Sequence, residues 1–188
     1  MILPIAAYGH PILRKKAINI EADYLNLQEL IANMFETMYF SKGVGLAAPQ
    51  INLSIRIFVI DASPYSSEYP EAEGFKKVFI NPIMIEEEGR LWLFNEGCLS
   101  VPEIREDISR KPNIKLAYYD ENFNYFEENF SGLPARVIQH EYDHLEGIVF
   151  VDKLSPLKKM LLKRRLTDIM RGHVNIPYKI LIQSKSKK

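Results

Sequence analysis

Apolar and polar residues alternate through most of the middle of the chain, which is the pattern of β-strands with one buried face. Strands are predicted over residues 51–60, 78–85, 90–94, 104–108, 114–119 and 123–130, and a last one over residues 174–182. Two polar stretches, residues 86–89 and 120–122, are typical of turns between neighbouring strands. Residues 62–74 combine Ser, Pro, Tyr and acidic side chains, and we expect them to form a surface loop.

Three other stretches repeat apolar residues at the spacing of an α-helix. They are residues 26–40, a central stretch over residues 134–147, and residues 157–170. In the central stretch Pro134 suits a first helical turn, Ser131 is a candidate N-cap, and Gly147 is a helix stop. The last of the three begins at Leu157, ends at Met170 and carries several basic residues.

These elements predict an α+β fold. We expect a single β-rich domain over residues 1–188, with mixed or antiparallel strands around the central helix and with an N-terminal and a C-terminal helix. A chain of 188 residues is long enough for one hydrophobic core and short for two domains. Residues 1–20 are expected to lie over the domain as an extended arm, and the residues from about 183 onward to form a basic tail.

The formal charge is balanced, with 24 basic and 24 acidic residues. A net charge of zero gives no general reason to expect nucleic-acid binding, so no sequence-specific contact with nucleic acid is predicted. A single cysteine excludes an internal disulfide and suits a reducing compartment. The apolar start is too short for a signal sequence, and no stretch has the length of a membrane span. We therefore expect a soluble cytoplasmic protein without a membrane partner.

The central helix contains a pattern that indicates metal chemistry. Residues 139–147 read Gln-His-Glu-Tyr-Asp-His-Leu-Glu-Gly. His140 and His144 are four residues apart, so a helix places both imidazoles on one face, one turn apart. Two neutral imidazoles in this arrangement can occupy adjacent corners of a tetrahedral metal site. Glu141, directly after the first histidine, stands where a general base for a metal-bound water is expected.

Two histidines do not complete a metal site, and the residues after them exclude two families of protease. Phe150 stands where metzincins have a third histidine, and no glutamate follows Glu146, which excludes a ligand of the thermolysin type. The remaining candidates are the aspartates Asp152 and Asp168, the histidines His10 and His173, and the cysteine Cys98. His10 lies between a glycine and a proline, which is typical of a turn.

Three segments of the chain, taken together, resemble the motifs of one family. Residues 43–50 read GVGLAAPQ, residues 96–100 read EGCLS, and residues 139–144 read QHEYDH. In their order and sequence they are similar to the motifs GxGLAAxQ, EGCLS and QHExxDH of the peptide deformylases. The resemblance covers nearly the whole chain, but it carries nothing over for residues 63–74 or beyond residue 171.

The resemblance implies that Cys98, His140 and His144 hold one divalent metal ion. A thiolate and two neutral imidazoles leave one open tetrahedral corner for water. In the family the ion is usually iron(II), with zinc, nickel and cobalt able to occupy the site, and these ligand types do not by themselves select among them. The reaction implied is removal of the N-formyl group from the initiator methionine of nascent polypeptides, with Glu141 moving the proton.

The resemblance also implies roles for residues outside the metal site. In the family Gln50, through its side-chain amide, and Leu99, through its backbone N–H, stabilise the tetrahedral oxyanion. The implied substrate-binding residues are Val44, Gly45 and Leu46 along the peptide backbone, Leu133 and Val137 around the methionine side chain, and Arg105 at the mouth. We expect an ion pair between Glu96 and Arg110 to fix the cysteine loop, whereas Asp143 is either a group that orients a ligand or a surface residue.

Three other functions stay open on the sequence alone. An HExxH metallopeptidase would share the helix but use a different third ligand. A thiol hydrolase would use Cys98 as its nucleophile, and a structural metal site in a ribosome-binding protein would have four protein ligands. The basic helix predicted over residues 157–170 is either a ribosome contact or a solvated helix face, which is the more common explanation for such charges.

Overall fold

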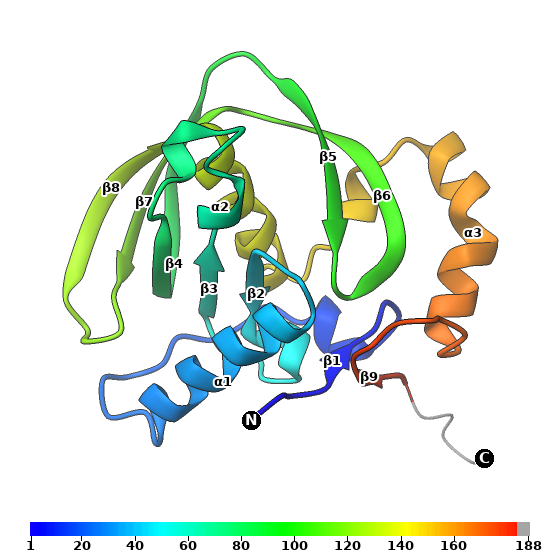
Figure 1. Cartoon of the computed structure of the whole chain (residues 1–188), viewed down its shortest axis with the longest axis horizontal. Helices are drawn as coiled ribbons and strands as arrows, with labels where there is room; N and C mark the ends of the chain where they lie inside the picture. The colour runs from blue at the N-terminus through cyan, green and yellow to red at the C-terminus, as the bar shows by residue number, and fades with distance from the viewer. Residues whose placement is uncertain (184–188) are drawn as a thin grey trace.

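The computed structural model describes residues 1–183, so the predicted basic tail falls almost entirely outside the described residues. Its main sheet has five antiparallel strands in the order β2–β3–β4–β7–β8. They are β2 (Gly45–Ala47), β3 (Ile57–Asp61), β4 (Lys76–Glu88), β7 (Asn113–Tyr119) and β8 (Tyr125–Ser131). A hairpin of β5 (Trp92–Cys98) and β6 (Val101–Arg110) lies beside this sheet, and β1 (Ile5–Ala6) pairs in parallel with β9 (Ile180–Leu181) (Figure 1).

Three α-helices accompany the strands in the described part of the chain. They are α1 (Leu27–Phe40), α2 (Gly132–Leu145) and α3 (Pro156–Met170). Short 3-10 helices cover Pro11–Arg14, Ala48–Ile51, Ser63–Tyr65, Pro70–Ala72 and Phe150–Lys153. In Figure 1, α2 lies between the five-stranded sheet and the β5–β6 hairpin, and α3 lies on the far side of that hairpin. The predicted α+β class is confirmed, with the central helix surrounded by mainly antiparallel strands.

The two faces of β3 explain how the core places the central helix. Phe58 and Ile60 belong to a buried cluster that also contains Ile138 and Leu145 of α2. Their neighbours in the strand belong to a second buried cluster, with the apolar face of α1. Because helices cover both faces of the sheet, this strand is apolar at successive positions and does not alternate. The metal-binding helix is thus fixed by a buried apolar stripe.

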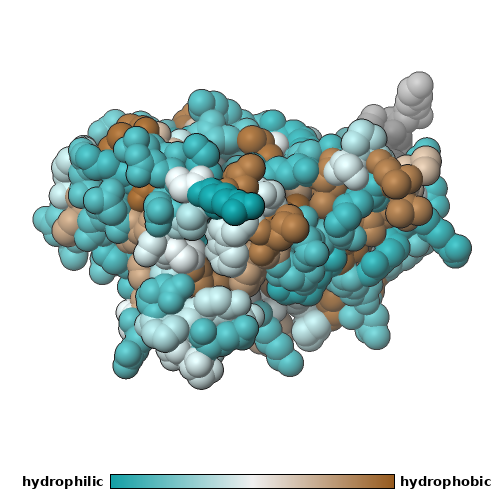
Figure 2. All heavy atoms as spheres, turned by 90° about the horizontal axis from the view of Figure 1, so that it is seen from above, coloured by the Kyte–Doolittle hydropathy of each residue, from teal (hydrophilic) through white to brown (hydrophobic). Residues whose placement is uncertain are grey.

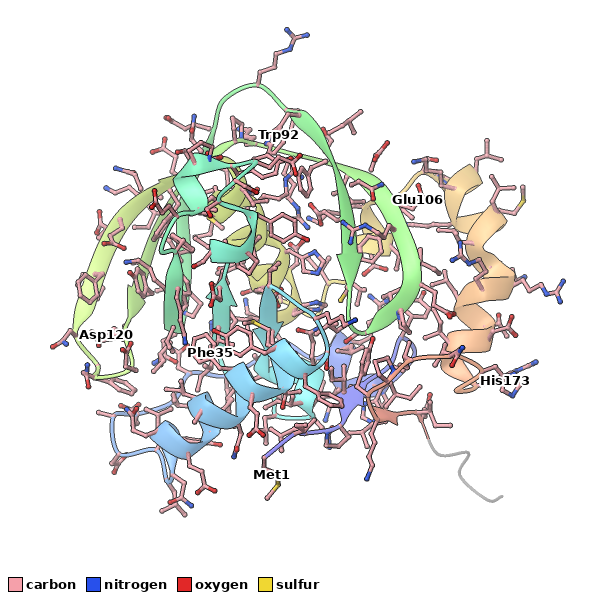
Figure 3. The ribbon with its side chains drawn as sticks, viewed as in Figure 1. Met1, Phe35, Trp92, Glu106, Asp120 and His173 are labelled. Atoms are coloured by element: carbon pink, nitrogen blue, oxygen red, sulfur yellow. The ribbon has the colours of Figure 1, made fainter. Side chains whose placement is uncertain are left out.

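The β5–β6 hairpin has its own buried cluster on the side away from the sheet. Ile104 and Ile108 of β6 pack with Leu162 and Leu166 of α3. An ion pair joins the same two elements, with 2.7 Å between Lys158 Nζ and an oxygen of Glu106, which Figure 3 shows on β6 beside α3. The C-terminal helix therefore supports the hairpin whose first strand, β5, ends at Cys98.

Several predicted boundaries are wrong, for identifiable reasons. The strand expected over residues 51–60 is shorter, because residues 48–51 form a 3-10 helix that leads to β3 at residue 57. The glutamates of residues 86–88 lie in the exposed end of β4, so the turn follows at residues 89–91. Of the strand expected over residues 174–182, only Ile180–Leu181 is regular.

The start of α2 also differs from the prediction. Ser131 occupies the N-cap position but makes no side-chain capping bond. Instead, the carboxylate of Glu71, from the loop over residues 62–74, accepts a hydrogen bond of 3.2 Å from the backbone N–H of Leu133. An acidic group at this end is also favoured by the helix dipole. A surface loop therefore supplies the group that the local sequence was expected to provide.

Figure 2 shows the molecule from above, where hydrophilic residues cover most of the face and apolar residues form separate patches between them. Within residues 1–183 no helix is both long enough and apolar enough to cross a membrane.

Candidate active site

Three potential metal ligands meet between the hairpin and the central helix. Cys98 ends β5, and His140 and His144 come from successive turns of α2. One ligand atom from each of the three lies within 4.8 Å of the other two. The Cys98 Sγ is 3.2 Å from Nε2 of His144. Within residues 1–183 this is the one cluster of three such side chains placed to hold an ion, and it contains the cysteine that the resemblance implied.

The other candidates for a third ligand have different partners or positions. Asp152 forms an ion pair with Arg14. Nδ1 of His10 accepts a hydrogen bond from the backbone N–H of Ile12, so His10 caps a 3-10 helix, as its place in a turn suggested. His173 lies beyond the C-terminal end of α3, on the outside of the molecule (Figure 3).

A buried ionic network supports the first histidine. Glu96 binds Arg110 through two bonds of 2.7 and 3.0 Å, and it also accepts a bond of 3.0 Å from Arg136. Its second oxygen is 2.9 Å from Nδ1 of His140. Arg110 also donates to Asp143 at 2.7 Å. The predicted Glu96–Arg110 pair is therefore present, and Asp143 is its extension. With Nδ1 bound to a carboxylate, His140 has its Nε2 available for a metal.

Burial and charge set the protonation of two glutamates in different directions. Burial alone raises the pKa of Glu96, but the hydrogen bonds from His140 and Arg110 outweigh it and hold that pKa well below the usual range. Among residues 1–183, Glu141 receives no hydrogen bond of this kind, and burial raises its pKa to about 7. The first glutamate is therefore held as an anion by its partners, whereas Glu141 keeps a carboxylate that is free to take up a proton inside the site.

Gly45 leaves the space that the carboxylate of Glu141 occupies. A Cβ built on this glycine would lie 2.8 Å from both Cγ and Cδ of Glu141, a separation that real Cβ atoms do not show. The first motif and the helix motif are thus in direct contact, although almost a hundred residues separate them. The glycine is required here for close approach and not for a left-handed backbone.

The donor set and one buried polar atom fit a divalent cation. A thiol and two imidazoles are the ligand types that zinc and iron(II) accept. Oε2 of Glu141 is buried and has no hydrogen-bond partner within residues 1–183. Because a buried polar atom without a partner is costly, Glu141 needs a donor inside the site, and a water beside a cation is one.

The amide of Gln50 has a defined orientation in the site. Its Oε1 accepts a bond of 2.8 Å from the backbone N–H of Ala47, which leaves its Nε2 on the side of the candidate ligands. That nitrogen lies 3.5 Å from Cys98 Sγ and 3.3 Å from the hydroxyl of Ser100. A neutral donor is therefore held beside the candidate ligand Cys98.

A cavity of about 420 Å³ opens from these residues to solvent. Val44, Gly45, Leu133, Val137 and Arg105 line it, which places five of the six expected substrate-binding residues there. The exception is Leu46, whose side chain is completely buried in the cluster around α1. Its strand β2 is nevertheless at the edge of the five-stranded sheet, where a further strand can pair with its backbone.

The sequence did not indicate several residues of the site. Ile176 and Tyr178 line the cavity from the C-terminal segment, and Tyr65 lines it from the loop over residues 62–74. Arg136 is 2% exposed, and its guanidinium lies 4.4 Å from the ring centre of Trp92 (labelled in Figure 3). A signal existed for the arginine, because it precedes His140 by four residues and so shares its face of α2. No local signal marks the other three.

This α+β domain places an HExxH helix next to a cysteine at the end of a strand. That arrangement defines a class of proteins, the metal-dependent hydrolases with an HExxH helix and a thiolate as candidate third ligand. A family model described as polypeptide deformylase matches residues 2–160. The peptide deformylase of Christiangramia forsetii is 55% identical, with 100% of this chain and 99% of that protein covered. The peptide deformylase of Flavobacterium psychrophilum is 53% identical, with both chains fully covered.

Solved structures agree with this similarity. A crystal structure of a peptide deformylase from Legionella pneumophila has a TM-score of 0.80 and 38% identity, covering 94% of this chain and 100% of that one. A Plasmodium falciparum peptide deformylase gives a TM-score of 0.80 at 36% identity, with 90% and 96% covered. The chain therefore belongs to the polypeptide deformylase family. Homology therefore identifies it as an enzyme with deformylase function. The same similarity does not favour the alternative of an HExxH metallopeptidase.

Proposed function

We propose that this chain removes the N-formyl group from the formylmethionine of nascent polypeptides, with Cys98, His140 and His144 as ligands of one divalent ion and Glu141 as the general base. The observation that carries this proposal is the convergence of the three ligand atoms beside Glu141, whose buried Oε2 has no hydrogen-bond partner in the described part of the chain. A divalent cation at this point would supply Lewis acidity and lower the pKa of a water molecule.

The protein groups then have distinct tasks in the hydrolysis. Glu141 takes a proton from water, whose oxygen bonds to the formyl carbon, and it gives a proton to the amine as the carbon–nitrogen bond breaks. Gln50 and the backbone N–H of Leu99 donate hydrogen bonds to the oxyanion of the tetrahedral intermediate. The products are formate and a peptide with a free amino terminus.

Substrate binding follows from the cavity and the edge of the sheet. The backbones of Val44, Gly45 and Leu46 pair with the substrate peptide as an added strand, because β2 is an edge strand. Leu133 and Val137 provide apolar walls for the methionine side chain, since both are buried and line the cavity.

We infer that Arg105, which lines the cavity, meets the substrate backbone further along the peptide. Its guanidinium donates to the side chain and the backbone carbonyl of Asn95, at 2.9 and 2.6 Å. These bonds fix its position next to Gly97. A fixed cation at the rim loses little side-chain entropy on binding a carbonyl group.

The test is release of formate from formyl-Met-Ala-Ser by protein purified without oxygen, with metal analysis of the same sample. We expect formate together with about one equivalent of metal, and no formate after chelation. Protein that retains its metal but cleaves internal peptide bonds instead would overturn the proposal. We propose iron(II) as the ion in the cell, with zinc, nickel or cobalt able to replace it, because a thiolate with two imidazoles accepts all four. Loss of activity on exposure to peroxide would support iron.

We further propose that the reaction takes place in the cytoplasm, where nascent chains are made, and that α3 contacts the ribosome. Lys158, Lys159 and Arg165 bind acceptors within the chain. Lys163 and Arg164 are exposed on the same helix, and we propose that these two basic side chains contact the ribosome. Reversal of these two charges should reduce co-sedimentation with ribosomes at low salt, and unchanged co-sedimentation would contradict the contact.

A further inference from the structure

Both terminal segments of the described chain bind the turn that carries the candidate oxyanion donor. This turn, residues 98–101, connects β5 to β6, with Cys98 paired to Val101 across it. The carbonyl of Ser100 accepts a bond of 2.7 Å from the backbone N–H of Tyr8, just after β1. The carbonyl of Leu99 accepts a bond of 2.9 Å from the hydroxyl of Tyr178, just before β9. Two successive carbonyls of the turn are thus held from opposite ends of the chain.

The two segments that hold the turn also hold each other. β1 and β9 pair in parallel, with bonds of 2.9 Å from Ile5 N–H to the carbonyl of Lys179 and 2.8 Å from Ala7 N–H to that of Leu181. Tyr178 is therefore fixed two residues before a paired position, and it is buried. A side chain anchored in this way can hold a backbone group with little freedom of its own.

The position of the Tyr178 hydroxyl matters because the turn carries the backbone N–H of Leu99, the candidate oxyanion donor. The direction of the Leu99 N–H is set by the peptide plane between residues 98 and 99. The orientation of that plane depends on Cys98 on one side and on the backbone conformation of Leu99 on the other. Within residues 1–183, Tyr178 supplies the side-chain hydrogen bond to the Leu99 carbonyl. Oxyanion donors act through prior alignment, so a hydrogen bond that fixes Leu99 contributes to catalysis through that residue.

We propose that Tyr178 is a positioning residue for catalysis, which holds Leu99 so that its backbone N–H is aligned with the oxyanion. The C-terminal segment is in this reading a part of the active site, since Ile176 of the same segment lines the cavity. This inference rests on the proposed function, in which Leu99 is an oxyanion donor.

The experiment compares Tyr178→Phe with the wild type and with Tyr125→Phe. The control removes a hydroxyl from Tyr125, an exposed tyrosine of β8 that does not line the cavity. One oxyanion donor is worth about 100-fold to 1,000-fold in kcat, and loss of its alignment should cost part of that, about tenfold for Tyr178→Phe. KM should change by less than about twofold, because binding of the ground state does not use the oxyanion donor. The control variant should match the wild type.

Two measurements separate positioning from a structural role. Backbone hydrogen exchange of residues 98–101 should become faster in Tyr178→Phe and not in the control, while metal content and affinity for the product Met-Ala-Ser stay at wild-type values. Replacement of Tyr178 by para-aminophenylalanine, whose amine can donate to the same carbonyl, should restore kcat. A Phe variant with unchanged kcat and unchanged exchange would overturn the inference, and so would a fall in kcat that is matched by loss of metal or of product affinity. If the wild type releases no formate, the proposed function fails, and the exchange measurement still decides whether Tyr178 holds the turn.

Discussion

The contact between Gly45 and Glu141 allows a sharp test of the proposed general base. In Gly45→Ala the new Cβ would lie 2.8 Å from Cγ and Cδ of the glutamate, against about 3.4 Å or more for ordinary contacts, so the side chain must move. The backbone of Gly45 does not lie in the left-handed region, and alanine is therefore tolerated there without strain.

The expected loss follows from the size of that displacement. General-base catalysis contributes about 100-fold to 10,000-fold, and a misplacement of about 1 Å costs about 100-fold. We therefore expect Gly45→Ala to reduce kcat by about 100-fold, which corresponds to about 2.7 kcal/mol of transition-state stabilisation. Glu141 is not one of the proposed ligands, so the metal content should stay at the wild-type value.

The assay is steady-state release of formate, with metal analysis and a melting temperature for each variant. Gly74→Ala is the matched control, because its added Cβ meets no atom within 4 Å. It should lose some stability from its left-handed backbone but keep its kcat. A double variant adds a second check. In a Glu141→Gln background, Gly45→Ala should cost little more, because both changes remove the same function. A Gly45→Ala protein with kcat within about twofold of the wild type and with normal metal content would refute the reasoning.

The remaining predictions concern the metal, the helix start, an ion pair and the domain. Cys98→Ala should lose its metal, as measured by elemental analysis, and retention of one equivalent would exclude the cysteine as a ligand. Glu71→Ala removes the acceptor at Leu133 N–H and should lower the free energy of unfolding in urea by about 1 kcal/mol. Burial raises the pKa of Glu146, but the hydrogen bonds from Lys16 and Arg56 outweigh it and lower that pKa. Its contribution is therefore present above the ordinary carboxyl pKa and is lost as the pH falls through the folded value, so the stability difference from Glu146→Gln should disappear in acid. We also propose that the chain is one domain, which predicts a single unfolding transition, coincident by circular dichroism and fluorescence.

The sequence was most informative where the chemistry depends on local spacing. The four-residue interval between His140 and His144 fixes their common face once the segment is helical, so this part of the site followed from the helix alone. The third ligand did not follow, because Cys98 reaches the histidines through the pairing of β5 with β6 and through the buried hydrogen bonds that join this hairpin to α2. The spacing left five candidates open, and the resemblance to a family selected one of them.

Long-range contacts account for the features that the sequence did not predict. β1 and β9 are two residues each and pair across almost the whole chain, so neither has a periodic pattern to detect. The start of α2 was assigned to Ser131 from local rules, but Glu71, distant in sequence, accepts the hydrogen bond. In both cases the hydrogen-bonding partner is determined by the tertiary fold and not by residues nearby in the sequence.

The buried arginines show a second limit, which concerns charge. Arg110 and Arg136 are both almost inaccessible, although a polar residue in an apolar helix or strand is usually assigned to the surface. Each is tolerated because Glu96 accepts hydrogen bonds from both, and the same carboxylate binds His140. Burial of each charged side chain therefore depends on burial of its partners. The hydropathy of single residues cannot identify such a group. The motif containing Glu96 did point to one pair, since its glutamate stands two residues before Cys98. The second arginine becomes predictable only when the face of α2 that carries the histidines is considered as a whole.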